Sequence, residues 1–198
     1  MKTFKGLKGF GLQGLNFTRL RVRIGLLFFI LFLLFMKPGP AGCFLSGLFL
    51  VIFGLAVRAW SSGHINKQAE LSTSGPYART RNPLYVGSFF IGLGLCVSCY
   101  DGSNPLLSAV TCLLFCLGFI LLYVVQISRE EEFLLKKFPA EFSGYEKEVP
   151  AFMPSLKPYS RRSANRFSAA LYLKNHEYRM LLAIAGMYLL LLLKKIIP

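Results

Sequence analysis

The chain has 198 residues, of which 54% are hydrophobic and only 16% are charged, and its net charge at pH 7 is +14. A typical soluble domain has about 25% charged residues, so this composition excludes an ordinary soluble protein and indicates a membrane protein. The basic residues flank the hydrophobic runs and form no stripe on a polar face, which argues against a nucleic-acid binder.

The first 60 residues are expected to form an arm followed by a helical hairpin. Residues 1–20 are rich in Gly, Lys and Phe and lack a helical period, so we expect a basic cytoplasmic arm against anionic lipid. The segment 21–60 contains apolar runs at 22–36 and 42–60, separated by the turn Lys37-Pro38-Gly39-Pro40. This pattern predicts an N-terminal transmembrane hairpin whose first helix is a retained anchor and not a cleaved signal peptide.

The segment 61–154 contains two further apolar runs, at 83–100 and 105–127. A helix needs about 20 apolar residues to cross about 30 Å of hydrocarbon, so both are candidate spans. The connection 101–105 contains Asp, Gly, Ser, Asn and Pro and is too short for anything except an antiparallel helical hairpin. The start of the first helix and the end of the second should therefore lie on the same membrane face.

Charged residues occupy the two ends that this hairpin brings together. Arg79 and Arg81 precede the first helix, and Glu130-Glu131-Glu132 follows the second. We therefore expect both arginines to lie near Glu130 and Glu131. Apolar residues spaced four apart, at 134 and 138, predict an amphipathic cytoplasmic helix after the glutamates, lying on the membrane or capping the bundle.

The segment 155–198 is predicted to be a basic linker followed by a hydrophobic helix. Its last apolar run, 180–193, spans a bilayer only if Lys194 and Lys195 extend their side chains to the interface. With five spans, 20 of the 23 Lys and Arg residues would share one side, which the positive-inside rule assigns to the cytoplasm. The fold class is therefore an all-α, polytopic bundle of about five transmembrane helices.

Few residues suggest a metal site. His64 and His176 lie far apart in the sequence and are expected to be solvated. Cys96-x-x-Cys99 lies inside a predicted span with no acidic residue or histidine nearby, so we expect packing thiols and no metal.

Motifs in the middle of the chain appear in a distinctive order. They are Gly75-Pro76-Tyr77, the run from Arg81 to Gly87 (Arg-Asn-Pro-Leu-Tyr-Val-Gly), Glu130-Glu131 and Val149-Pro150. Over about residues 70–154 this order resembles the C-terminal signature of the isoprenylcysteine carboxyl methyltransferase and phospholipid methyltransferase superfamily of integral membrane enzymes.

The sequence departs from that signature at three positions. Asn82 stands where the isoprenylcysteine enzymes have His, Pro139 replaces a Gly, and Phe142 replaces a Tyr. An asparagine can still donate and accept hydrogen bonds, so cofactor binding survives the change better than any role that needs an ionisable imidazole. The acceptor is therefore expected to differ from prenylcysteine.

The resemblance implies methyl transfer from S-adenosylmethionine, bound in a pocket open to the cytoplasm, to a membrane-embedded lipid or hydrophobic small molecule. A carboxylate or an amine is the expected acceptor group, although the sequence does not distinguish a carboxylate, an amine or a thiol, and an amine would first have to lose a proton. Arg81 and Glu131 would take catalytic roles. The resemblance places the following residues in the cofactor site: Tyr77, Arg81, Asn82, Pro83, Tyr85, Gly87, Glu130 and Glu131.

Other interpretations remain open at this point. Arg79 and Arg81 could be juxtamembrane anchors, and the glutamates could be a solvated helical turn. Gly92-x-Gly94 lies inside a span and follows no strand, which favours helix packing over nucleotide binding. The function could also be that of an NADPH-dependent membrane reductase of the sterol type or a non-catalytic membrane protein, and the oligomeric state is undetermined.

Overall fold

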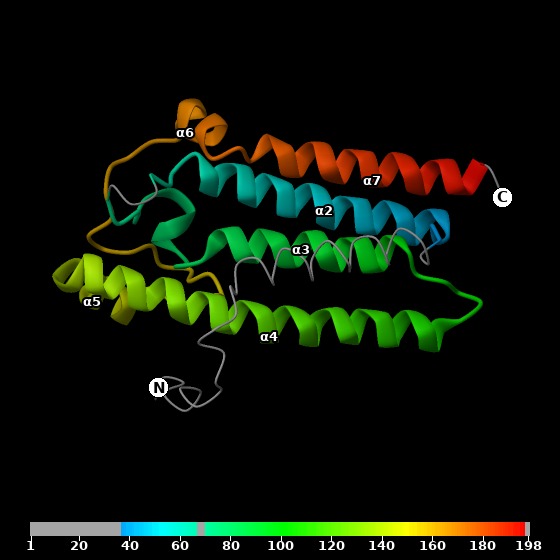
Figure 1. The fold of residues 1–198 in the computed structure, drawn as a ribbon, viewed down its shortest axis with the longest axis horizontal. Helices are drawn as coiled ribbons and strands as arrows, with labels where there is room; N and C mark the ends of the chain where they lie inside the picture. The colour runs from blue at the N-terminus through cyan, green and yellow to red at the C-terminus, as the bar shows by residue number, and fades with distance from the viewer. Residues whose placement is uncertain (1–36, 67–69, 197–198) are drawn as a thin grey trace, which may run out of the picture. The chain divides into compact units, whose positions relative to one another are not determined.

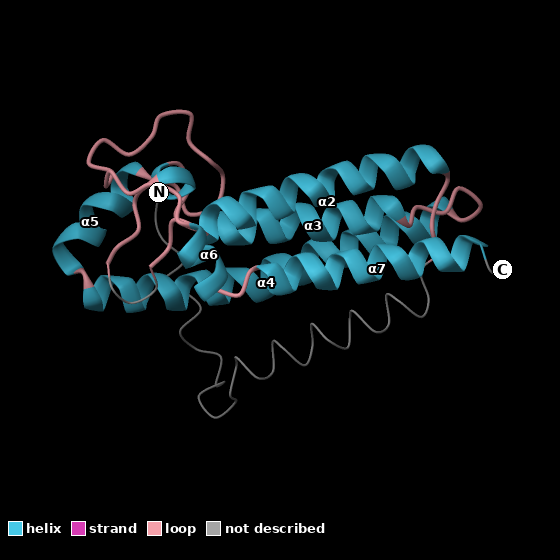
Figure 2. Ribbon diagram, turned by 90° about the horizontal axis from the view of Figure 1, so that it is seen from above, coloured by secondary structure: helices cyan, strands magenta, loops and turns pink. Residues whose placement is uncertain are grey.

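The computed structural model describes residues 37–66 and 70–196, and these residues form helices and no strand. The arm predicted at 1–20 and the span predicted at 22–36 lie outside the described residues. Figures 1 and 2 show α2, α3, α4 and α7 running side by side, with η2, α5 and α6 gathered at one end of these four helices. The elements are α2 (Ala41–Ser62), η2 (Gly75–Ala78), α3 (Pro83–Ser98), α4 (Pro105–Lys137), α5 (Pro139–Glu148), α6 (Ala169–Lys174) and α7 (Tyr178–Ile196).

Helices α2 and α3 pack antiparallel through a seam of glycines. A Cβ atom added to Gly54 would lie 2.6 Å from the carbonyl oxygen of Gly87, and one added to Gly94 would lie 2.6 Å from that of Gly47. Two backbones can approach this closely only where neither residue has a side chain. The seam fixes the depth of α3 relative to α2, and thereby the position of the residues at the N-terminus of α3.

Helices α3 and α4 form the predicted antiparallel hairpin. Asn104 begins α4 by accepting a hydrogen bond from the Leu107 amide at 3.2 Å. Gly92 of α3 faces the ring of Phe115 of α4, and Phe89 of α3 packs edge-to-face on Phe119 of α4 with ring centroids 5.2 Å apart. The aromatic residues therefore fill the space between the two helices. They lie toward the polar end of the bundle, which is the end that carries Arg81, Glu130 and Glu131.

The amphipathic helix predicted to start after the glutamates is not a separate element. It is the continuation of α4, which runs for 33 residues without a break. Residues 126–137 contain strong helix formers and neither Gly nor Pro, so nothing ends the helix at the membrane boundary. Lys136 and Lys137 lie in the last turn, where they interact favourably with the helix dipole, and Pro139 starts α5.

Large apolar side chains cover the outside of the bundle. Leu106 and Leu121 of α4 are 74% and 70% exposed, and Phe49 of α2 is 70% exposed. Two helices in the described part of the chain, α2 and α4, are long and apolar enough to cross a membrane, and their apolar stretches are only 22% and 6% buried. Such bare apolar faces indicate a membrane protein.

Two more apolar helices flank these two. Helix α3 has 16 residues, and α7 has 19 but carries Arg179 near its start and Lys194 and Lys195 in its last turn. Tyr188 of α7 contacts Ser98 of α3 through their hydroxyls at 2.6 Å. The number of five spans stays a prediction.

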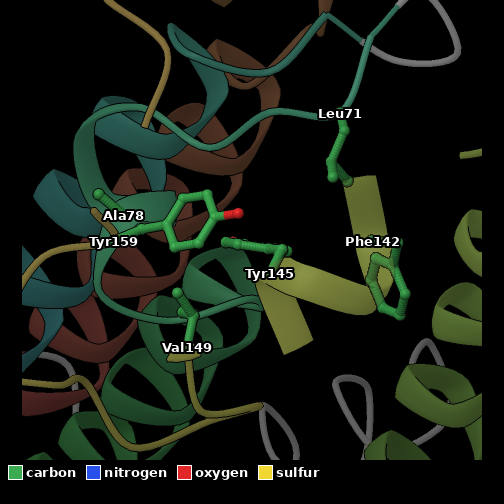
Figure 3. Packing of buried hydrophobic residues seen from close by; sticks show 6 residues of the cluster. All are labelled: Leu71, Ala78, Phe142, Tyr145, Val149 and Tyr159. Atoms are coloured by element: carbon green, nitrogen blue, oxygen red, sulfur yellow. The ribbon is translucent and has the colours of Figure 1, made fainter. Parts of the chain in front are cut away.

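A small hydrophobic core lies outside the apolar helices and supports the polar end (Figure 3). The Tyr145 hydroxyl of α5 donates to the Tyr77 carbonyl oxygen at 2.6 Å, and the Tyr159 amide donates to the Ala78 carbonyl oxygen at 2.7 Å. These bonds fasten α5 and the segment after it to η2. The core consists of Leu71, Ala78, Phe142, Tyr145, Val149 and Tyr159.

Candidate functional site

The candidate site lies where the 74–82 turn meets the far end of α4. Gly75 has φ of +55°, and an added Cβ would also come within 2.6 Å of the His64 ring, so only glycine fits this position. Pro83 is fully buried at the first turn of α3, where its missing N–H costs little. The Arg81 amide donates to the Pro150 carbonyl oxygen at 2.9 Å, which holds the turn against the end of α5.

Arg81 joins three separate segments. Its Nε donates to Glu131 Oε1 of α4 at 2.8 Å, and its Nη1 donates to the carbonyl oxygens of Glu146 and Val149 at 2.9 and 2.8 Å. The Arg81 and Glu131 side chains are only 13% and 20% exposed. This partly buried ion pair is the contact expected from the helical hairpin, and through it Arg81 links α4 to the end of α5.

Asn82 extends the same network at the N-terminus of α3. It is 8% exposed, and its Nδ2 donates to the Ala151 carbonyl oxygen at 2.9 Å and, more weakly, to Glu131 Oε1 at 3.5 Å. A neutral amide supplies both hydrogen bonds without a proton to exchange. At this position the structure therefore shows a fixed donor in place of the titratable ring that the superfamily signature carries.

Glu130 is held by two different partners. The Tyr85 hydroxyl and Gln126 Nε2 both donate to its Oε1, the second at 2.7 Å. Tyr85 also packs edge-to-face on Tyr123, with ring centroids 4.7 Å apart. Sequence reasoning missed Gln126, although its spacing of four residues from Glu130 on one helix face was a usable signal.

Both glutamates have an unused oxygen. Every hydrogen bond to Glu130 and Glu131 among the described residues is made to Oε1, so in this part of the chain Oε2 of each has no partner. Two half-buried carboxylate oxygens with free lone pairs suit ligand groups that donate hydrogen bonds, such as ribose hydroxyls or an ammonium group. These two acceptor oxygens therefore fit S-adenosylmethionine, which carries both kinds of donor group.

Tyr77 is buried without a partner for its hydroxyl. The residue is 5% exposed, and its hydroxyl finds no hydrogen-bond partner within residues 37–66 and 70–196. Burial raises the pKa of this phenol, and the nearby Tyr145, Glu130 and Glu177 raise it further, against an opposing effect of Arg58. Tyr77 is therefore a neutral donor placed where its proton has no protein acceptor.

A second polar cluster lies beside the first and was missed from the sequence. Arg58 of α2 forms an ion pair through Nε with Glu177, and its Nη1 donates to Ser88 Oγ and to the Leu84 carbonyl oxygen. The Arg58 and Glu177 side chains are 14% and 11% exposed. Two signals were present: Arg58 interrupts an apolar run, and Glu177 is the only acidic residue after Glu148.

Other predicted residues lie elsewhere. Arg79 was expected near the glutamates, but its Nη1 donates to the Ser155 and Leu156 carbonyl oxygens at 3.3 and 2.6 Å. Gly87 faces α2, where an added Cβ would come within 2.5 Å of Arg58 Cγ. The expectation that His64 is solvated is wrong, because the ring is 6% exposed and its Nδ1 lies 2.9 Å from the Trp60 carbonyl oxygen. The described residues contain no group of three or more His, Cys, Asp or Glu side chains placed to hold a metal ion.

Comparison with known proteins gives one family and two relatives. Residues 40–141 match the sequence profile described as "Phospholipid methyltransferase". Cobalt-zinc-cadmium resistance protein CzcN of Cupriavidus metallidurans is 36% identical over 74% of this chain and 69% of its own length. Nickel-cobalt-cadmium resistance protein NccN of Alcaligenes xylosoxydans xylosoxydans is 33% identical over 59% of this chain and about half, 52%, of its own length. No solved structure matches significantly.

Proposed function

Because the chain belongs to the phospholipid methyltransferase family, we propose that it transfers a methyl group from S-adenosylmethionine to a membrane-embedded lipid or small hydrophobic acceptor. The observation that carries the proposal is the Arg81–Glu131 ion pair at 2.8 Å, with Glu130 one residue away and a free oxygen on each glutamate. Its site is proposed to open toward the cytoplasm, since the positive-inside rule assigns the basic residues that flank the predicted spans to that side.

The residues of the chain act by binding and orienting. When bound, S-adenosylmethionine supplies an electrophilic methyl group on a positively charged sulfur. We assign its hydroxyl or ammonium groups to Oε2 of Glu130 and Glu131, which Tyr85, Gln126 and Arg81 hold in place. Methyl transfer requires the acceptor atom to lie in line with the methyl group at about 3 to 3.5 Å, which is a positioning task.

The nature of the acceptor decides whether a base is needed. A carboxylate is already ionised at neutral pH and needs none. A protonated amine must first lose a proton; in that case we assign Oε2 of Glu131 to accept it, and Oε2 of Glu130 alone to hold the cofactor. Arg81 would then act through Glu131, because its own Nε and Nη1 are committed to protein oxygens.

The test is methyl incorporation from radiolabelled S-adenosylmethionine into a total lipid extract, with the purified chain in detergent. The substitution Glu131→Gln should lower incorporation roughly 10- to 100-fold, because a charge-assisted contact is worth about 1.5 to 3 kcal/mol. Glu132→Gln is the matched control, since Glu132 is 62% exposed on its side chain and pairs with Lys136. Equal incorporation by wild type and Glu131→Gln would refute the assignment of Glu131.

Two other functions predict different binding results. A reductase would bind NADPH and not S-adenosylmethionine, whereas a non-catalytic protein would bind neither tightly. Calorimetric titration of the purified chain with each cofactor separates them. Tight NADPH binding without S-adenosylmethionine binding would overturn the proposal.

The names of the relatives suggest a physiological setting. CzcN and NccN are named for resistance to cobalt, zinc, cadmium and nickel. We propose that this chain contributes to metal tolerance through a methylated membrane product. Expression in a cadmium-sensitive host should raise the tolerated concentration, and Glu131→Gln should abolish that rise. Equal protection by Glu131→Gln would separate metal tolerance from methyl transfer.

A further inference from the structure

The Arg58 cluster contains a positively charged group with unused donors. Nε of Arg58 is bonded to Glu177, and Nη1 is bonded to Ser88 Oγ and to the Leu84 carbonyl oxygen. Among the described residues no hydrogen bond is made by Nη2, which carries two more N–H donors. Arg58 is thus held in one orientation by three contacts while one edge of its guanidinium group stays unoccupied.

Tyr77 supplies a second unused donor in the same region. Its hydroxyl is buried and unpartnered, and the charges of Arg58, Glu177 and Glu130 all act on it. A buried hydroxyl without a partner costs about 1 to 3 kcal/mol relative to a bonded one, so such a group indicates a missing ligand atom. Tyr77 lies in η2 and Arg58 in α2, two elements that pack against each other in the fold.

Glu177 is held in place by a constrained turn. His176, the residue before it, has φ of +56°, a conformation that is unusual for a residue with a side chain. Asn175 Nδ2 donates to the carbonyl oxygens of Ser62 and Ile65 at 2.9 and 3.1 Å, which ties this turn to the end of α2. The turn therefore directs Glu177 at Arg58, and it does so from a segment outside the matched region 40–141.

We propose that Arg58 and the Tyr77 hydroxyl bind an oxyanion of the methyl acceptor, a carboxylate or a phosphate, and that Glu177 is the residue that positions Arg58. The buried Tyr77 hydroxyl and the charged Nη2 of Arg58, neither of which bonds to a described protein group, would pair with the two oxygens of such a group. This assigns Tyr77 to the acceptor in place of the donor-binding role that the resemblance implies. The inference rests on the proposed function in so far as it calls the ligand an acceptor.

The single tryptophan of the chain offers a binding signal that does not depend on activity. Trp60 lies two residues after Arg58 on α2. The purified full chain in maltoside micelles is titrated with dioctanoyl phosphatidic acid, octanoate and inorganic phosphate, and Trp60 fluorescence is followed. A saturable change with either lipid probe supports the inference, and the probe that binds more tightly identifies phosphate or carboxylate. Saturation by inorganic phosphate alone would overturn the assignment to a lipid acceptor, as would no saturable change with any probe.

Substitution of Tyr77 gives the sharpest comparison. Tyr77→Phe removes one hydroxyl and keeps the ring, so the dissociation constant of the bound probe should rise about tenfold, the effect of one hydrogen bond to a charged group. Tyr159→Phe is the matched control, because Tyr159 is also buried but lies in the hydrophobic core. An unchanged dissociation constant in Tyr77→Phe would overturn the proposal.

Arg58 is tested in a way that spares the fold. Replacing Arg58 alone leaves the carboxylate of Glu177 buried and unpaired, so the double variant Arg58→Gln/Glu177→Gln is used instead. It should lose saturable probe binding while its thermal unfolding temperature stays close to that of the wild type. Retained probe binding in a folded double variant would contradict the role of Arg58.

Calorimetric titration with S-adenosylmethionine separates this inference from the proposed function. The affinity for S-adenosylmethionine should be unchanged in Tyr77→Phe. A tenfold loss would reassign Tyr77 to the donor and overturn the inference. If the wild type binds the lipid probes but not S-adenosylmethionine, the proposed function fails and the oxyanion site stands.

Discussion

The substitution Arg81→Lys tests whether the guanidinium group of Arg81 fixes α5 to the candidate site. Arg81 makes three side-chain hydrogen bonds, one to Glu131 of α4 and two to the carbonyl oxygens of Glu146 and Val149 at the end of α5. A lysine keeps the positive charge, but its single ammonium group cannot reach all three acceptors. We expect the substituted lysine to keep the pairing with Glu131 and to lose both bonds to α5.

The size of the effect follows from the lost bonds. Each hydrogen bond from a charged donor is worth about 1.5 to 3 kcal/mol, and partial exposure and relaxation reduce the sum to about 2 to 4 kcal/mol. That is roughly a 30- to 700-fold increase in the equilibrium constant for local opening of α5. Helices α2 and α3 pack on each other through their glycine seam, which does not involve the Arg81 side chain, so the rest of the fold should persist.

Hydrogen exchange followed by mass spectrometry measures this opening by segment. Peptides from α5, residues 139–148, should exchange faster in Arg81→Lys, and peptides from α2 should not change. Arg79→Lys is the control, because the Arg79 side chain bonds to the Ser155 and Leu156 carbonyl oxygens and not to α5. Unchanged exchange of α5 in Arg81→Lys, or an equal increase in Arg79→Lys, would refute the reasoning.

Two further predictions concern stability. Gly87→Ala should destabilise the chain by about 1 to 3 kcal/mol in thermal unfolding, because the new Cβ would lie 2.7 Å from the Gly54 carbonyl oxygen. Gly118→Ala, where an added Cβ would meet nothing within 4 Å apart from the backbone of its own helix, should be neutral or slightly stabilising, and an equal loss in both would contradict the glycine seam. Burial raises the pKa of Tyr145 above its ordinary value of 10.0, so its contribution to stability is complete below pH 10 and is lost as the pH rises above 10. Denaturant unfolding between pH 9 and 11 should show this fall, with a shallower slope in Tyr145→Phe; an identical slope would contradict it.

The helical hairpin of α3 and α4 was predictable because local rules determine it. Pro83 and Pro105 mark the starts of both helices, and a connection of a few polar residues permits only an antiparallel return. The end of α4 was not predictable in the same way. Hydropathy reports where a helix leaves the hydrocarbon, whereas the end of a helix depends on breakers, and the first one after the span is Pro139.

The candidate site was predictable only in part. The contact between Arg81 and Glu131 follows from the hairpin. The same reasoning predicted that Arg79 would also lie near the glutamates, but its side chain turns toward Ser155 and Leu156 instead. Arg79 and Arg81 are only two residues apart, and their side chains point in different directions because of the backbone geometry of the turn, which the sequence does not reveal. The pairing of Arg58 with Glu177 joins residues 119 positions apart and depends on how α7 packs against α2.

The unequal lengths of α3 and α4 have a consequence for the surrounding bilayer. At about 1.5 Å per residue, the 16 residues of α3 measure about 24 Å and the apolar residues 105–127 of α4 about 35 Å, against about 30 Å of hydrocarbon. If α3 crosses the bilayer, as the sequence predicts, it is shorter than the hydrocarbon and the lipids that border it would be drawn toward the mid-plane. Their headgroups would then come level with the charged N-terminal end of α3, so that hydrophobic mismatch would deliver lipid to that end.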